Sequence, residues 1–213
     1  MSEIARKVAQ YLLQIKAVEL SPSFPFTWVS GIKSPIYCDN RKILSHPSVR
    51  NYIIESFCEL VDNQYSHANV IAGVATAGIA HAALIAWREN LPMIYVRSKA
   101  KEHGMQNLIE GVIDEGQKVV VVEDLISTGK STLAAVAALR AKNVEVLGAV
   151  AIFSYGFKET QERFAAADCP FQTLSHYDVL VEEALKHGYV EESTMKTLKE
   201  WNANPKAWKG VKN

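Results

Sequence analysis

The sequence has few cysteines, no long hydrophobic run and no net charge of either sign. Its three cysteines, Cys38, Cys58 and Cys169, are far apart and include no C-x-x-C pair, which argues against a disulfide framework or a zinc cluster. Isolated thiols are typical of a reducing compartment. No apolar stretch approaches the ~18 residues of a transmembrane helix, and the N-terminal segment lacks the apolar core of a signal peptide. These absences predict a cytoplasmic protein with no membrane partner.

The charge balance also excludes a class of partner. Lys and Arg together number 23 and Asp and Glu together number 23, so the formal net charge is +0. A chain without net charge has no general attraction to nucleic acid, and any basic site must be local. The length of 213 residues suits one domain, predicted here to span residues 1–213.

Hydrophobic periodicity predicts an α/β fold. Residues 3–16 read as an amphipathic helix that Ser2 can cap, and Pro47 suits the first turn of a second helix. Apolar strands and helices then alternate, which implies a parallel sheet. The strands are predicted at 70–74, 93–96, 118–123 and 144–153, and helices at 80–87 and 131–142. Prolines, aromatics and Gly31 between Ser21 and Asp39 predict a small flap outside this sheet.

The strongest functional signal is the segment from Val119 to Thr132. A buried β-branched strand leads to Glu123 and Asp124, and the loop 127–131 then opens a helix. Ligands bind at the carboxyl ends of parallel strands, and backbone amides at a helix N-terminus attract phosphate. An ordinary capped turn would also contain Ser, Thr and Gly, but it needs no acid pair in register. Carboxylates accept hydrogen bonds from sugar hydroxyls, so the pattern predicts a phosphorylated sugar as the ligand.

The end of this segment also resembles a nucleotide-binding P-loop, but the match fails at one position. A P-loop requires glycine five residues before Gly129, and this chain has Asp124 there. A carboxylate at that point would repel the phosphates of a nucleotide.

Three segments resemble a known family. Glu123-Asp-Leu-Ile-Ser-Thr-Gly-Lys-Ser131 resembles the phosphoribosyl-diphosphate motif of type I phosphoribosyltransferases. Phe26-Thr-Trp-Val-Ser-Gly-Ile-Lys-Ser-Pro-Ile-Tyr-Cys-Asp-Asn-Arg41 resembles the N-terminal hood of orotate phosphoribosyltransferases, and Arg97-Ser-Lys-Ala-Lys-Glu-His-Gly104 resembles their catalytic loop. The resemblance runs from about Ile4 to Ser154. It implies a parallel-sheet type I phosphoribosyltransferase fold with a small N-terminal hood, contributed mainly by about residues 18–42.

The resemblance also implies roles for individual residues. Asp124, Lys101 and His103 are expected to be catalytic, and Ser127, Tyr37 and Cys38 are expected to bind orotate. The donor, 5-phosphoribosyl 1-diphosphate, is expected to contact Arg97, Lys101, His103, Glu123, Asp124, Leu125, Ile126, Ser127, Thr128, Gly129, Lys130 and Ser131. Magnesium is expected to arrive with the diphosphate, with few or no direct protein ligands. No metal ligand is therefore assigned to this chain.

Several positions depart from the family pattern. Ser98 stands where relatives often have a lysine, and the sequence leaves open whether Lys99 replaces it. Relatives can also have a lysine at Ala77, so the loop 75–78 is expected to bind through backbone amides. The segment 154–157 lacks the arginine that relatives use near the base. The partner of the orotate carboxylate therefore stays open, with Lys33 the nearest cation in the hood and Lys158 a weak candidate.

The remaining polar and aromatic residues give weaker signals. No histidine lies in a metal-ligand spacing, so a structural or surface position is expected for His46, His67, His81, His176 and His187. Trp28 fits the lining of the hood and core packing equally well. Packing or surface positions are expected for Trp87, Trp201 and Trp208.

The implied reaction transfers the phosphoribosyl group to orotate, giving orotidine 5′-phosphate and diphosphate in de novo pyrimidine (UMP) biosynthesis. The resemblance further implies a homodimer with shared active sites. Two alternatives are a phosphoribosyltransferase for another base and a donor-sensing regulator on the same fold. The hood opposes the first, and zero net charge with a complete cationic loop opposes the second.

Overall fold

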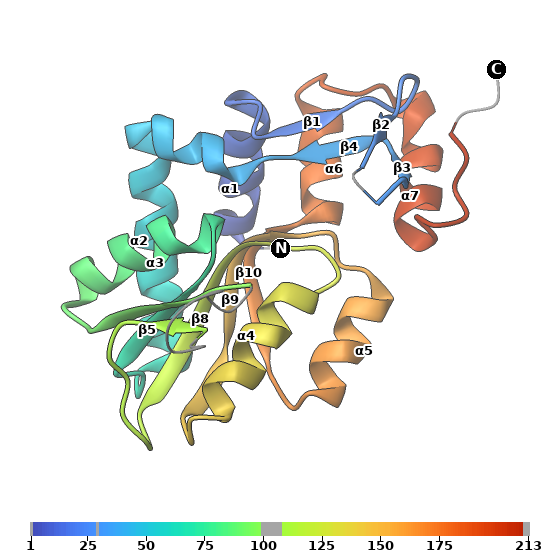
Figure 1. The fold of residues 1–213 in the computed structure, drawn as a ribbon. Helices are drawn as coiled ribbons and strands as arrows, with labels where there is room; N and C mark the ends of the chain where they lie inside the picture. The colour runs from blue at the N-terminus through green and yellow to red at the C-terminus, as the bar shows by residue number, and fades with distance from the viewer. Residues whose placement is uncertain (1, 29, 99–107, 211–213) are drawn as a thin grey trace.

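The computed structural model describes residues 2–28, 30–98 and 108–210, and a six-stranded sheet forms its centre (Figure 1). The strand order is β10-β9-β8-β5-β6-β7, and all neighbours are parallel except the antiparallel pair β6–β7. The strands are β5 (Val70–Val74), β6 (Met93–Val96), β7 (Ile109–Glu110), β8 (Lys118–Ile126), β9 (Glu145–Ser154) and β10 (Phe171–His176). The predicted α/β fold with a parallel sheet is confirmed, whereas β7 and β10 were not predicted.

Helices cover both faces of the sheet (Figure 1). Buried residues of four helices, together with Leu198 and Trp201 of α7 (Met195–Ala203), share one core with Val120 and Val122 of β8, and those of two others share a second core with Val119 and Val121. The first set is α1 (Glu3–Gln14), α2 (Pro47–Tyr65), α3 (Ala77–Glu89) and α6 (Tyr177–Lys186); the second is α4 (Lys130–Arg140) and α5 (Lys158–Ala166). Successive valines of β8 thus face opposite cores, which is why the strand is uniformly β-branched.

Local signals in the sequence explain where several helices begin. Ser2 caps α1, since its Oγ accepts a hydrogen bond from the backbone nitrogen of Ala5 at 3.1 Å. Pro47 occupies the first turn of α2, where its missing N–H has no intrahelical partner to lose. Gly78 allows α3 to approach the sheet, because a Cβ there would lie 2.5 Å from the carbonyl oxygen of Val122. That contact brings the start of α3 next to the end of β8.

The central strand is longer than predicted. β8 continues to Ile126, because Leu125 pairs with Phe153 and Ile126 pairs with Ser154 of β9. Asp124 therefore lies within the strand rather than after it, and Glu123, already predicted within the strand, pairs with Ala151 of β9. The following helix begins at Lys130, one residue before its predicted start.

The flap predicted for residues 21–39 is a pair of small sheets, which belong to the hood (residues 18–42). β1 (Val18–Leu20) pairs with β4 (Ile36–Cys38), and β2 (Phe26–Thr27) pairs with β3 (Lys33–Ser34). A 3-10 helix, η1 (Asn40–Ser45), follows β4 in the chain. Its first residue, Asn40, donates its Nδ2 hydrogen to the carbonyl oxygen of Asp124 at 2.7 Å. The hood is thereby attached to the carboxyl end of β8.

The C-terminal part of the described chain supports the hood. After the 3-10 helix η2 (Glu192–Thr194), α7 (Met195–Ala203) lies beside β2 and β3 (Figure 1). Trp201 of α7 is fully buried and donates its Nε1 hydrogen to the carbonyl oxygen of Lys33 at 3.2 Å. The predicted packing role of Trp201 is confirmed. No helix among the described residues has both the length and the apolar character needed to cross a membrane.

Candidate active site

Glu123 and Asp124 lie side by side near the carboxyl end of β8, but their environments differ. Glu123 is buried, and one of its carboxylate oxygens accepts hydrogen bonds from Ser131 Oγ at 3.3 Å and Thr132 Oγ1 at 3.4 Å. The other oxygen accepts from the backbone nitrogen of Asp124 at 3.1 Å. Glu123 therefore ties the strand to the first turn of α4, a role that the sequence did not suggest.

The two carboxyl groups differ in their tendency to carry a negative charge. Burial raises the pKa of Glu123, and the charge of Asp124 beside it raises that pKa further. Burial also raises the pKa of Asp124, but hydrogen bonds from Glu123 and from the Leu125 backbone oppose this effect. The pair therefore favours a proton on Glu123 and a negative charge on Asp124. A single carboxylate at this position can stabilise a positive charge that develops on a bound sugar.

The loop after β8 has the geometry of a phosphate site. Gly129 has a φ of 74°, in the left-handed region, and a Cβ there would lie 2.4 Å from Cε2 of Phe164. Thr160 Oγ1 donates to the carbonyl oxygen of Ser127 at 2.6 Å and holds the start of the loop. The first amides of α4 have no intrahelical partners, and glycine supplies no side-chain cap. The loop can therefore offer a phosphate several N–H donors and the positive end of a helix dipole.

A second helix N-terminus lies beside the first. The turn between β5 and α3 contains Ala75 and Thr76, and Thr76 forms no side-chain cap bond to the helix. β5 and β8 are parallel neighbours, and Gly78 contacts Val122, so α3 and α4 begin at the same edge of the sheet. Two adjacent helix N-termini suit a ligand that has phosphate groups at two points.

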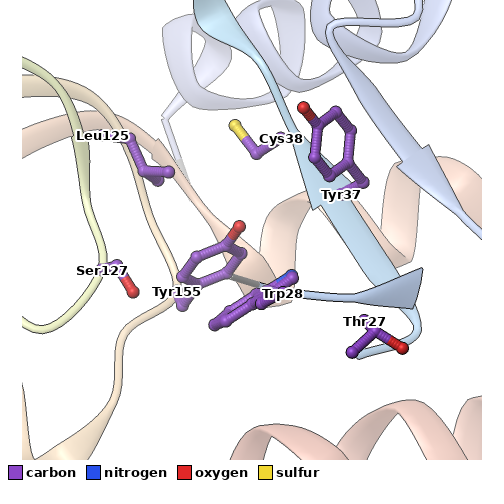
Figure 2. A pocket seen from close by; sticks show the side chains of 7 residues that line it. All are labelled: Thr27, Trp28, Tyr37, Cys38, Leu125, Ser127 and Tyr155. Carbon is purple, nitrogen blue, oxygen red and sulfur yellow. The ribbon is translucent and has the colours of Figure 1, made fainter. Parts of the chain in front are cut away.

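A cavity of about 290 Å³ opens between the hood and the carboxyl ends of β8 and β9 (Figure 2). Figure 2 shows Leu125 and Ser127 on one side, Tyr37 and Cys38 of the hood on another, and Tyr155 and Trp28 between them. The lining is mostly apolar and aromatic, which suits a flat ring. It consists of Thr27, Trp28, Tyr37, Cys38, Leu125, Ser127 and Tyr155.

The cavity brings together the three residues expected at the base site, Tyr37, Cys38 and Ser127. Sequence reasoning left Trp28 undecided and did not select Thr27 or Tyr155. Tyr155 directly follows β9, and the rule that ligands bind at carboxyl ends of parallel strands could have found it. Thr27 gave no signal, because an isolated threonine in a short strand is common.

The polar groups of the cavity are neutral. Burial raises the pKa of the Tyr155 hydroxyl well above its usual range. Burial and then the charge of Asp124 raise the pKa of the Cys38 thiol, whose Sγ lies 3.4 Å from Oδ1 of Asn40. The Tyr155 hydroxyl and the Cys38 thiol are therefore protonated near neutral pH. The cavity therefore favours a planar, polar ring over a charged chain.

The other expected donor-binding residues differ in where the structure places them. The Ile126 side chain is buried in the core that contains α4, so only its backbone can reach a ligand. Thr128, Lys130 and Ser131 lie on or beside the phosphate loop, with Lys130 and Ser131 exposed. Arg97 follows β6, and its Nη1 lies 3.4 Å from Oε1 of Glu110. Lys99, Lys101 and His103 lie outside the described residues.

Two further predictions concern metal ligands and histidines. Among residues 2–28, 30–98 and 108–210, no three His, Cys, Asp or Glu side chains are grouped as metal ligands. Asp124 could offer carboxylate oxygens to a magnesium ion that a diphosphate brings with it, as Mg²⁺ commonly keeps waters and phosphate ligands. His81 is buried in α3, and burial lowers its pKa to about 4, so it is neutral.

Comparisons with known proteins agree with this geometry. The phosphoribosyl transferase domain family matches residues 40–185. The chain is 53% identical over 205 residues to the orotate phosphoribosyltransferase of Listeria innocua, covering 96% of this chain and 98% of that protein. It is 54% identical over 200 residues to the Bacillus subtilis enzyme of the same name, covering 94% and 93%. The crystal structure of orotate phosphoribosyltransferase from Aeropyrum pernix matches with a TM-score of 0.76 and 28% identity, covering 86% of this chain and 99% of that one.

Proposed function

The chain belongs to the orotate phosphoribosyltransferases of the phosphoribosyltransferase family, and we infer from this membership and its site that it is a pentosyltransferase of pyrimidine biosynthesis. It transfers the phosphoribosyl group of 5-phosphoribosyl 1-diphosphate to orotate, which yields orotidine 5′-phosphate and diphosphate. The observation that supports this function best is the position of the aromatic cavity. It lies directly beside Asp124 and the phosphate loop, so a base and a sugar phosphate can meet at the carboxyl end of β8.

The arrangement supports a specific placement of the donor. Its 5-phosphate binds the amides of the loop from Ser127 to Ser131, and its ribose hydroxyls contact Asp124. The diphosphate lies towards the N-terminus of α3. Orotate stacks in the cavity between Trp28, Tyr155 and the hood. Because the cavity and the loop share Ser127, a base in the cavity and a ribose bound beside the loop can lie next to each other.

The charges fit a transition state in which the sugar becomes positive and diphosphate leaves. Asp124 stabilises the positive sugar, since an opposite charge near a developing charge is worth most in a site that excludes water. Arg97, Lys101 and His103 stabilise the departing diphosphate, as the family resemblance implies. Magnesium bound to the diphosphate would supply further positive charge. The protein's contribution is to orient donor and base.

The choice of base can be tested by direct competition. We expect orotate to be the best substrate when orotate, uracil, hypoxanthine and guanine are offered with equal donor and magnesium. The hood at Tyr37 and Cys38 resembles the orotate-specific subfamily, and both residues line the base cavity. Product formation measured by chromatography gives the order of the four bases. A purine as the best substrate would show that the hood argument is wrong.

We also propose a two-fold homodimer in which the segment 97–104 completes the neighbour's site. This proposal rests on the family resemblance. Lys101→Ala and Asp124→Asn are each expected to give a nearly inactive protein. Unfolding equal amounts together and refolding them should restore about a quarter of wild-type activity, because half the dimers are mixed and half of their sites are intact. Activity that stays at the level of the separate variants, while mixed dimers are shown to form, would place Lys101 in its own subunit's site.

The cellular location is a further proposal. Cys38, Cys58 and Cys169 are all free thiols, two of them buried, and such thiols are typical of proteins from reducing compartments. This supports a cytoplasmic enzyme.

A further inference from the structure

The base cavity has an unexplained chemical feature. Orotate is a carboxylate, yet the described residues that line the cavity include no lysine, arginine or histidine. A carboxylate that leaves water without a cationic partner or strong donors is costly. A cation or a set of hydrogen-bond donors at the edge of the cavity must therefore bind the carboxylate.

Among the described residues, Lys33 has an ammonium group in contact with the cavity lining. Its Nζ donates a hydrogen bond to Oγ1 of Thr27 at 2.8 Å, and Thr27 lines the cavity on the hood side (Figure 2). The two residues face each other across the β2–β3 ladder. An ammonium has three donors and uses one on Thr27, while the Thr27 hydroxyl, as an acceptor of that bond, keeps its own hydrogen to donate. Together they offer a carboxylate several donors and a positive charge.

The position of Lys33 is fixed by its backbone. The fully buried Trp201 donates to its carbonyl oxygen at 3.2 Å, and the Trp201 ring lies 5.7 Å from the rings of both Trp28 and Tyr155. Trp28 and Tyr155 are walls of the base cavity. Trp201 thus contacts both the walls of the cavity and the strand from which the Lys33 side chain extends.

Other cations near the hood are already engaged. Arg41 Nε lies 2.6 Å from Asp39 Oδ1. Lys158 lies 3.7 Å from Oε1 of Glu162 and lines a separate cavity of about 210 Å³. In the described part of the chain, Lys33 has Thr27 as its hydrogen-bond partner and forms no ion pair with a carboxylate. Its charge is therefore available to a ligand.

We propose that Lys33, together with the hydroxyl of Thr27, recognises the carboxylate of orotate and thereby sets the specificity of the enzyme for orotate over uracil. The proposal rests on the proposed function. The role of Lys33 is separate from the stacking of the base and from the role of Asp124. Lys33 binds the carboxylate substituent that distinguishes orotate from uracil.

The test compares two ligands that differ only in this carboxylate. Orotidine 5′-phosphate and uridine 5′-phosphate are titrated by calorimetry into wild type, Lys33→Met and Lys33→Arg, which requires no turnover. Lys33→Met is expected to weaken orotidine 5′-phosphate binding by about 10- to 100-fold, as for the loss of a hydrogen bond to a charged group, and to leave uridine 5′-phosphate binding unchanged. Lys33→Arg retains the charge and should recover part of the loss. Thr27→Val should weaken only the orotidine ligand, by a smaller factor.

Lys158→Met is the matched control, since it removes a neighbouring lysine whose described contacts are elsewhere. It should leave the ratio of the two affinities unchanged. The proposal is overturned if Lys33→Met weakens both ligands equally, if it weakens neither, or if Lys158→Met removes the discrimination instead. A wild-type protein that does not consume orotate in the base competition would refute the proposed function, which is a different result from any of these.

Discussion

Replacing Asp124 by asparagine is expected to slow phosphoribosyl transfer by at least ~100-fold, the effect of losing one preorganised electrostatic group at a reacting centre. Asparagine has almost the same size, so the strand backbone at this position, which accepts the Asn40 hydrogen bond, is retained. Only the negative charge that stabilises the positive sugar is lost. The measurement is steady-state transfer with saturating orotate and donor, which separates kcat from KM.

Glu123→Gln is the informative comparison. The raised pKa of Glu123 means that the wild-type side chain already favours the neutral form, and glutamine can keep hydrogen bonds to the hydroxyls of Ser131 and Thr132. We therefore expect a smaller loss of activity than for Asp124→Asn. Wild-type turnover by a well-folded Asp124→Asn protein would show that Asp124 does not face the developing charge. Equal losses of activity for both variants would contradict the inference that Asp124 carries the negative charge and Glu123 the proton.

Replacing Trp201 by alanine is expected to lower the free energy of unfolding by about 3–5 kcal/mol, the usual cost of removing a fully buried tryptophan side chain. The ring is inaccessible to solvent and lies within 5.4 to 5.7 Å of the rings of four neighbours. These are Trp28, Tyr155, Phe157 and Tyr177. The variant also leaves the carbonyl oxygen of Lys33 without its partner. Denaturant unfolding followed by fluorescence and circular dichroism measures the difference.

Trp87→Ala provides the control for the loss of a tryptophan. Trp87 is 80% exposed on α3, so its removal should change stability by no more than about 0.5 kcal/mol. In the folded Trp201→Ala protein, the KM for orotate should rise more than the KM for the donor, because the affected rings line the base cavity and not the phosphate loop. A uniform change in both KM values, or equal stability losses for the two variants, would argue against this role of α7.

The sequence predicted the central part of the site because its signals are local. The valine run before Glu123 fixes a strand buried on both faces, and the Gly129 loop must follow it directly, so strand, acids and helix are read from one segment. Pro47 and Ser2 mark helix starts in the same way. The hood residues Tyr37 and Cys38 came from family resemblance.

The features that the sequence did not reveal depend on contacts between distant segments. Trp201 contacts Lys33, which is 168 residues away in the sequence, and no sequence pattern near either residue predicts the contact. Glu123 looked like a second sugar ligand, because its bonds to Ser131 and Thr132 depend on how α4 is oriented after the loop. β10 begins with Phe171 and contains three polar residues in its first five positions, so it lacks the continuous apolar run that marked β8.

The position of Cys38 has a consequence for the chemical durability of the enzyme. A thiol reacts with oxidants and electrophiles through its thiolate, and the thiolate fraction falls as the pKa rises. Burial and the negative charge of Asp124 both raise the pKa of Cys38. Burial first, and then the carboxylate that stabilises a positive sugar, therefore favour the unreactive, protonated form of the sulfur next to the base. We therefore expect Cys38 to react slowly with oxidants, which protects the substrate site.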